Sequence, residues 1–228
     1  MGILDLIFPK SCLSCGKSGG YICLSCINKV KTPRPICPIC LKPSLRGMAH
    51  PVCRGPLNLD GLVSLWNYDG VVRKAILTLK YKFALEISKE LSNYAIHRIG
   101  ETKLKFSKDD ILVPIPLYWY KKNFRGFNQG EEIGGQIAQL LGLRFVPDLL
   151  IKKTSTIPQT GLRRSDRLRN VENVFILNPS HSSFMSRNCF ILFDDVWTTG
   201  TTLKEATKIF KKAGALEVRG LTLARGVS

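Results

Sequence analysis

Two patterns of apolar residues alternate along residues 60–228, one typical of strands and one typical of helices. Short apolar runs, which are typical of buried strands, occupy residues 62–68, 111–115, 189–193 and 218–224. Apolar residues at helical spacing occupy residues 71–79, 84–99 and 203–213, the last closed by Gly214. Strands that alternate with helices in this way predict an α/β fold, a mainly parallel sheet with helices on both faces.

A further helix is predicted over the segment from Glu131 to Leu140. Its apolar face is marked by Ile133, Ile137 and Leu140. Glu131 and Glu132 lie in its first turn, where carboxylates interact favourably with the helix dipole. The polar stretch 178–188 shows no such period and is predicted to be a surface connection.

The first 57 residues hold seven of the eight cysteines of the chain. They form three Cys-x-x-Cys pairs and one single residue, namely Cys12, Cys15, Cys23, Cys26, Cys37, Cys40 and Cys53. His50 stands three residues before Cys53 and completes the spacing of a fourth pair. Ligands two residues apart form knuckles that point both side chains at one tetrahedral metal. We therefore predict a small zinc-binding module over residues 1–57 and an α/β domain over residues 58–228.

Two pairings of these ligands satisfy the spacings. In the sequential pairing, the first four cysteines hold one ion and the second set, Cys37, Cys40, His50 and Cys53, holds another. An interleaved pairing remains open. His50 is the weakest ligand, because a single His in a loop is commonly solvated, and without it the second site is incomplete. A module of this size buries little apolar surface, so metal binding would supply most of its folding free energy.

The alternative use of so many cysteines is a disulfide scaffold, which requires export from the cell. Residues 1–9 have no basic start and no small-residue cleavage site, so they make a poor signal peptide. No run of about 18 uncharged apolar residues is present, so no membrane span is predicted. We expect a cytoplasmic protein with reduced thiols. Cys189 lies inside an apolar run and is predicted to be an ordinary buried thiol.

The chain is strongly basic, with 34 Lys and Arg against 17 Asp and Glu and a formal net charge of +17. Residues 1–55 carry eight basic residues and one acidic residue, a net charge of +7. Such a field attracts polyanions, among them nucleic acid and phosphorylated metabolites. Contact with nucleic acid and simple solubility both remain open as explanations.

The most informative segment is residues 191–203, where an apolar run ends on Asp194 and Asp195. A loop rich in Thr and Gly follows, made of Thr198, Thr199, Gly200, Thr201 and Thr202. The next helix is predicted to start there, with Thr202 and Glu205 spaced as a capping box. In open α/β sheets, ligands bind beyond the C-terminal ends of the strands, which is where this loop would lie.

The chemistry of this segment suits a phosphosugar. Free N–H groups at the helix start and the threonine hydroxyls suit a phosphate dianion, and Gly200 lets the backbone approach it closely. The two carboxylates can accept hydrogen bonds from the vicinal hydroxyls of a ribose, so the segment predicts a 5-phosphoribosyl site. Paired acids at a strand end also occur in Walker B elements and receiver domains. The first needs a P-loop, which this sequence lacks, and the second does not explain the Thr-rich loop.

The loop is similar to the diphosphate-sugar motif of type I phosphoribosyltransferases, and other segments extend the likeness. They are Val113-Pro-Ile-Pro116 with residues 124–129, Gln159-Thr-Gly-Leu162 running on to Arg167-Leu-Arg-Asn170 and Val174-Phe175, and the ladder of cysteine pairs. With them, nearly the whole chain resembles the ComF/GntX family, phosphoribosyltransferase-like proteins linked in some bacteria to natural competence.

The resemblance implies a sheet with the strand order of type I phosphoribosyltransferases, preceded by a double zinc ribbon. It also implies Mg²⁺-dependent binding of 5-phosphoribosyl 1-diphosphate. Asp194 and Asp195 would face the ribose hydroxyls, and the 5-phosphate would be enclosed by Thr198, Thr199, Gly200, Thr201 and Thr202. The usual ribbon has a Cys where this chain has His50, and Trp197 is bulkier than the usual residue at its position.

The resemblance assigns two further groups of residues. The turn at Pro114 and Ile115 would hold the diphosphate, while the nucleobase or acceptor side would be lined by Arg125, Asn128 and Gln129. Candidates to neutralise the departing pyrophosphate are Lys80, Lys82, Arg125 and Arg163, although most Lys and Arg of so basic a chain are simply solvated. His97 and His181 are interpreted as structural or surface residues.

Two hypotheses of different classes follow. In the first, the chain is a phosphoribosyltransferase-like enzyme or phosphosugar sensor linked to DNA uptake, in which a nitrogen nucleophile would displace pyrophosphate from C1 with Asp194, Asp195 and Arg125 as catalytic residues. In the second, it is an adaptor whose ribbons and basic surface bind single-stranded DNA, and the phosphoribosyl site recognises a nucleotide or strand end. A DNA-uptake helicase is a further partner consistent with either.

Overall fold

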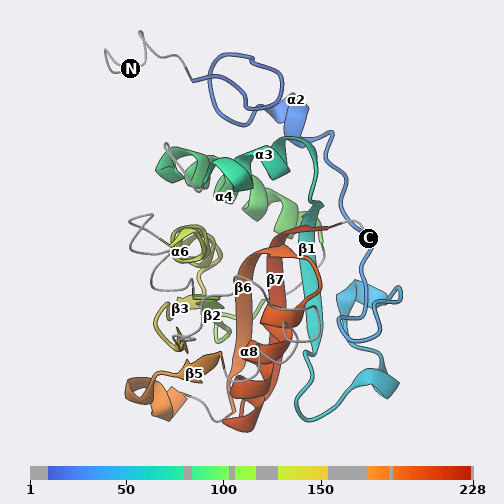
Figure 1. The fold of residues 1–228 in the computed structure, drawn as a ribbon, viewed down its shortest axis with the longest axis vertical. Coiled ribbons are helices and arrows are strands. Elements are labelled where there is room, and N and C mark those ends of the chain that lie inside the picture. Colours follow the sequence, from blue (N-terminus) through green and yellow to red (C-terminus); the bar gives the residue numbers. More distant parts are fainter. Residues whose placement is uncertain are drawn as a thin grey trace, which may run out of the picture.

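The computed structural model of the chain describes residues 10–79, 84–102, 106–116, 128–153, 174–184 and 187–226. Five parallel strands form the main sheet in the order β1-β7-β6-β2-β3. They are β1 (Gly61–Asn67), β2 (Ile111–Pro114), β3 (Arg144–Phe145), β6 (Cys189–Trp197) and β7 (Glu217–Arg225). The predicted α/β class is confirmed (Figure 1).

Helices cover both faces of this sheet. Alternate side chains of β6 point to opposite faces, and those on each face pack against a different set of elements. Ile191 and Phe193 belong to a core cluster with the three helices α3 (Gly70–Thr78), α4 (Ala84–Glu101) and α6 (Gln129–Leu141). Phe190 and Leu192 belong to a second cluster with α8 (Thr201–Lys212) and the antiparallel pair β4 (Leu150–Lys152) and β5 (Phe175–Leu177). Ring centroids of Phe190 and Phe210 of α8 lie 4.8 Å apart.

The predicted C-terminal end of the strand at residues 189–193 is wrong. The strand does not end at Phe193 but runs to Trp197, because its pairing with β7 continues through Asp194 and Thr222 to Trp197 and Arg225. The two acids therefore lie within the last part of the strand.

The predicted capping box at the start of α8 does not form. The helix begins at Thr201 with Gly200 as its N-cap, before the cap predicted at Thr202. The carboxylate of Glu205 instead pairs with Lys208, 2.6 Å away. Because a glycine cap has no side chain, the helix start is not closed by one of its own residues.

The predicted apolar face of α6 is wrong at Leu140, which is 56% exposed. The buried face is centred instead on Ile137 and Gly134, and Leu141 packs against the core. Gly134 and Ala138 allow the helix to approach the sheet closely, and small residues of this kind do not register as a hydrophobic pattern.

Two smaller predictions concern the segment before β6. The polar connection 178–188 contains a short 3₁₀ helix, Pro179–Phe184. Cys189 is half-buried rather than fully buried, and burial raises the pKa of its thiol. No helix among the described residues is both long and apolar enough to cross a membrane.

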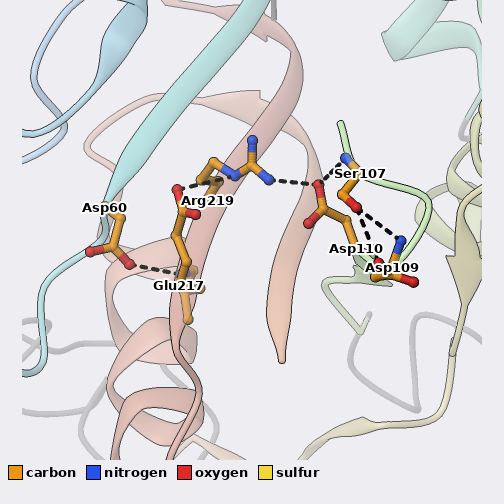
Figure 2. A network of polar contacts seen from close by, with 7 residues as sticks. Asp60, Ser107, Asp109, Asp110, Glu217 and Arg219 are labelled. Carbon is orange, nitrogen blue, oxygen red and sulfur yellow. Dashed lines mark hydrogen bonds and ion pairs between the residues drawn. The ribbon is translucent and has the colours of Figure 1, made fainter. Parts of the chain in front are cut away.

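The N-terminal ends of β2 and β7 are held together by ion pairs (Figure 2). Arg219 donates from Nη2 to Asp110 Oδ2 at 2.6 Å, and the same carboxylate oxygen accepts from the backbone N–H of Ser107 at 2.9 Å. Glu217 Oε1 lies 3.4 Å from Arg219 Nε. Asp110 is 2% exposed, so this end of the sheet buries an acid with its cation.

The first cysteine-rich segment packs on α4. Two of its residues belong to the core cluster of α3 and α4, namely Ile22, which precedes the short helix α2 (Leu24–Ile27), and Ile27, the last residue of that helix. The carboxylate of Glu90 accepts from the backbone N–H groups of Tyr21 and Ile22 at 3.1 and 2.7 Å. Lys10 and Glu86 form an ion pair at 2.7 Å. This ribbon is therefore anchored by apolar and polar contacts.

The second cysteine-rich segment and the linker before it lie along β1, the edge strand of the sheet (Figure 1). This segment contains the 3₁₀ turns Leu45–Gly47 and Pro51–Cys53. The backbone N–H of Asn67 donates to the Lys31 carbonyl at 2.8 Å, and Met48 forms an antiparallel bridge with Gly61. Ile36 and Ile39 pack against the cluster of α8. Contacts thus cross the predicted boundary between residues 57 and 58, which stays a prediction.

Candidate functional site

The predicted acid pair lies at the C-terminal part of β6. The backbone N–H of Asp195 donates to Asp194 Oδ1 at 2.9 Å. Burial, and then the negative charge of Asp195, raise the pKa of Asp194 to about 8. With its pKa raised in this way, the carboxyl group of Asp194 can donate a hydrogen bond at neutral pH as well as accept one.

Lys152 of β4 acts on the same pair from another part of the fold. Its positive charge lowers the pKa of Asp194 and so opposes the effect of burial. Lys152 stands 42 positions before Asp194 in the chain, and no sequence motif connects the two. Sequence reasoning missed this residue for that reason.

The Thr/Gly loop after β6 encloses a small cavity together with Asp194. The five predicted loop residues all line it, namely Thr198, Thr199, Gly200, Thr201 and Thr202. The hydroxyls of Thr199 and Thr201 lie 2.9 Å apart. Within the described residues, no side chain accepts from the backbone N–H of Thr202 or Leu203, so these donors can serve a ligand.

Glycine is required at position 200 for two reasons. Its φ of 75° lies in the left-handed region. A Cβ built there would lie 2.1 Å from the ring of Trp197, which is buried beneath the loop. The bulky Trp197 is thus compatible with the loop because residue 200 has no side chain.

The second predicted loop begins beside the first. Pro114 of β2 is in register with Phe193, and the backbone N–H of Ile115 donates to the Phe193 carbonyl at 2.8 Å. The start of α6 lies against this turn, since a Cβ at Gly130 would be 3.5 Å from the Ile115 carbonyl oxygen. The structure therefore brings Pro114 and Ile115 to the same end of the sheet as the acid pair.

Asn128 closes the start of α6. Its Oδ1 accepts from the backbone N–H of Gly130 at 3.0 Å, and its Nδ2 donates to Glu131 at 2.9 Å. Asn128 and Gln129 are both buried. The amide of Asn128 thus serves the helix start, while its assignment to the acceptor side stays a prediction.

Several predicted residues lie outside the described part of the chain, namely Lys80, Lys82, Arg125 and Arg163. The same holds for residues 124–127, 159–162 and 167–170 of the family segments. His97 Nδ1 lies 3.4 Å from Glu101, and His181 Nε2 lies 3.0 Å from Asp148. These contacts agree with the interpretation of both histidines as structural or surface residues.

The eight predicted metal ligands form two compact groups, in the sequential pairing. One group is Cys12, Cys15, Cys23 and Cys26, and the other is Cys37, Cys40, His50 and Cys53. Within each group, one ligand atom from every residue lies within 4.8 Å of the others. Four soft donors at such separations are consistent with a tetrahedral zinc site, and the interleaved pairing does not occur.

His50 has the geometry of a ligand. Its Nδ1 lies 3.4 Å from Cys40 Sγ, inside the second group, and its Nε2 lies 3.0 Å from the carbonyl oxygen of Pro43. A carbonyl accepts, so Nε2 carries the proton and the lone pair of Nδ1 faces the sulfurs. Zinc-ligating histidines are commonly oriented by a hydrogen bond of this kind.

The thiols within each group differ in pKa, as expected where several thiolates would lie close together. Burial alone would raise the pKa of Cys12, but backbone N–H groups of the knuckle lower it to about 6. Cys37 is lowered to about 6 in the same way. Hydrogen bonding to Cys15 and Cys23 raises the pKa of Cys26 to about 12, and burial together with Cys40 and Cys37 raises that of Cys53 to about 11. A divalent cation removes this conflict by stabilising all the thiolates at once.

Fold and sites together define a class, an α/β protein with a parallel sheet preceded by two cysteine-rich zinc-ribbon clusters. Comparison with known proteins agrees at the N-terminus, where the double zinc ribbon domain matches residues 3–55. Adenine phosphoribosyltransferase is among the similar solved structures, with a TM-score of 0.40 and 15% identity over 62% of this chain and 71% of that one.

Relatives match over most of the chain. It is 29% identical over 168 residues to competence protein F of Haemophilus influenzae, which covers 73% of each chain. It is 28% identical over 214 residues to the DNA utilization protein YhgH of Escherichia coli K12, which covers 90% of each. Competence protein ComFC of Bacillus subtilis is 27% identical over 216 residues, 90% of this chain and 84% of its own. Over most of its length the chain is similar to the ComF, ComFC and YhgH proteins, and the resemblance found in the sequence is confirmed.

Proposed function

We propose that the chain binds 5-phosphoribosyl 1-diphosphate at the C-terminal end of β6, as a phosphoribosyltransferase-like protein that acts in DNA uptake or utilization. One observation carries the proposal, namely that Asp194 and the Thr198–Thr202 loop line one cavity at the start of α8. The similarity to a competence protein and to a DNA utilization protein supports the link to these processes.

Each part of the ligand has a suitable partner. The 5-phosphate accepts hydrogen bonds from the first N–H groups of α8 and from the hydroxyls of Thr199 and Thr201. The ribose hydroxyls donate to Asp194 and Asp195, and the raised pKa of Asp194 leaves a proton that the pair can donate in return. The turn at Pro114 and Ile115 lies beside β6, where the diphosphate would extend.

Carboxylate oxygens next to a diphosphate are donors that suit Mg²⁺, which binds through one or two carboxylates together with substrate phosphates. Asp194 and Asp195 are the described residues that would hold it. The ion would neutralise the charge that develops on the departing pyrophosphate. The residues of the chain would hold C1 of the sugar in line with an incoming nitrogen nucleophile and exclude water.

Isothermal titration with 5-phosphoribosyl 1-diphosphate, with and without Mg²⁺, tests the proposal. We expect Mg²⁺-dependent binding that the Asp194→Asn/Asp195→Asn double variant weakens by about 100-fold, since charge-assisted hydrogen bonds to both hydroxyls are lost. Asp109→Asn, an exposed acid before β2, serves as the charge control and should bind like wild type. Equal binding by the double variant and wild type would refute the site. A screen of purine and pyrimidine bases for pyrophosphate release then tests turnover.

We also propose that each cysteine-rich group holds one zinc ion. Native mass spectrometry should show two zinc ions per chain. His50→Ala should retain one, whereas the matched variant His50→Cys should retain two, because it restores a fourth soft ligand. A count of two for His50→Ala would show that His50 is not required to hold the second ion.

A further inference from the structure

A second cavity adjoins the phosphate loop and belongs to no predicted site. Its volume is about 220 Å³, and it lies between α8 and the end of the second ribbon segment. Thr199 and Thr201 line both this cavity and the small one enclosed by the loop. A ligand on the loop can therefore continue into the second cavity past these two hydroxyls.

One wall of this cavity is polar and comes from a single face of α8. Thr201, Lys204 and Lys208 stand at positions i, i+3 and i+7, so they share that face. Lys208 is paired with Glu205, which lies on the same face. Lys204 has no carboxylate partner among the described residues, and its Nζ lies 5.7 Å from the ring centroid of Trp197.

The opposite wall is apolar and comes from the ribbon side. It is formed by Ile39, Leu57 and Leu59, with Asn58 between the last two. Asn58 donates from Nδ2 to the Cys53 carbonyl at 3.0 Å, which ties this wall to the last ligand of the second group. A cavity with one cationic and one apolar wall suits a nucleoside, whose base is apolar on its faces and whose sugar is polar.

A free phosphosugar does not reach this cavity, because its chain ends at the 5-phosphate on the loop. A ligand that fills both must be esterified on that phosphate, as a nucleotide within a strand is. At the other end, Asp194 and Asp195 face the sugar hydroxyls. In the absence of Mg²⁺, a strand that continued through its 3′ oxygen would bring a phosphate anion against these acids, which is unfavourable.

From these two constraints we propose that the site binds the 3′-terminal nucleotide of a nucleic-acid strand. The phosphodiester on its 5′ side lies on the Thr/Gly loop, the preceding nucleoside occupies the cavity between α8 and the ribbon, and the free 3′ hydroxyl faces the acid pair. The proposal rests on the proposed function for the position of the phosphate and sugar.

Small diesters of defined length test it by isothermal titration at fixed salt. The probe is the dinucleotide d(TpT) with a free 3′ hydroxyl, and the reference is the methyl diester of thymidine 5′-phosphate, which has the same charge and lacks the second nucleoside. Burial of one base face should make d(TpT) bind about tenfold more tightly. A 3′-phosphate on d(TpT) should weaken its binding by about tenfold or more. The ribose dinucleotide UpU, compared in parallel, distinguishes RNA ends from DNA ends.

A charge variant locates the effect. Lys204→Gln should reduce the advantage of d(TpT) over the methyl diester to about threefold or less while binding of the free diphosphate sugar remains. Lys212→Gln, an exposed lysine in the last turn of α8, makes the same charge change and should leave the advantage intact.

The outcomes separate the two proposals. If the diphosphate sugar binds but d(TpT) is no tighter than the methyl diester, the strand-end proposal is wrong and the phosphosugar site stands. The strand-end proposal is also wrong if the 3′-phosphate does not weaken binding. If neither the sugar nor any diester binds, both proposals fail.

Discussion

Two acids at opposite ends of the same sheet have opposite surroundings: Asp110 is buried and Asp194 is half-buried. At the N-terminal end, Asp110 is paired with Arg219 at 2.6 Å and accepts from the Ser107 amide. At the C-terminal end, Asp194 stands beside a second acid, and burial and that neighbour raise its pKa to about 8. The positive charge of Lys152 offsets these effects only in part, so the acid pair is where a ligand is expected.

Removing the cation at the N-terminal end should have the largest effect. Arg219→Met leaves Asp110 buried without a positive partner, which should lower the free energy of unfolding by about 3–5 kcal/mol. Urea denaturation measures this change. The double variant Arg219→Met/Asp110→Asn should recover part of the loss, because no charge is then left unpaired. Binding of the diphosphate sugar by folded protein should not change, and a loss of binding would mean that the two ends are coupled.

Adding a methyl group to the loop at the C-terminal end of the sheet should have the next largest effect on stability. Gly200→Ala places a Cβ 2.1 Å from the Trp197 ring and should cost about 2–3 kcal/mol of unfolding free energy as well as ligand binding. Gly142→Ala is the matched control, since Gly142 has a similar φ of 66° and no atom within 4 Å of the built Cβ. It should cost only about 1 kcal/mol. Equal losses would mean that the ring contact is not important.

Neutralising one acid of the pair at the C-terminal end should stabilise the protein. Asp194→Asn should raise the free energy of unfolding at pH 8 by about 1–2 kcal/mol, opposite in sign to the change at Asp110, because a buried repulsion is removed. Thermal melting in the absence of ligand measures it. A destabilised Asp194→Asn variant would instead indicate a structural acid, like Asp110.

The pH dependence gives the most specific signal. The pKa of Asp194 is raised from 3.8 to about 8, so between these values the folded state binds more protons than the unfolded state. Its contribution to stability is fully present below pH 4 and is lost as the pH rises towards 8. Unfolding free energies of wild type minus those of Asp194→Asn should therefore decline over this window, and a flat difference would contradict the raised pKa.

Features that are local in the chain could be predicted from the sequence. The acid pair and the Thr/Gly loop are contiguous, so a strand followed by a helix suffices to bring Asp194 and Gly200 together. The cysteine spacing predicted which side chains lie together within each pair, since each knuckle is a local turn. The choice between sequential and interleaved pairing is not local and needed the structure.

Features that depend on contacts between distant segments could not be predicted. The extension of β6 to Trp197 arises from its register with β7, and the charge of Lys152 reaches Asp194 through the packing of β4. The wall of Leu57 and Leu59 faces α8 because the second ribbon folds back along the sheet. The order of hydrophobic and polar residues within one segment does not indicate which distant segment it will contact.

The ribbon that lies along β1 has a practical consequence for dissecting this protein. β1 is the outer strand of the sheet, and the linker and second ribbon meet it through the contacts of Lys31 and Met48. A truncation at residue 58 would uncover a row of unpaired N–H and C=O groups, the template on which strands of other molecules assemble. Aggregation of the truncated domain could then be mistaken for loss of activity, so the contribution of the ribbons is better measured in full-length chains with single ligand substitutions.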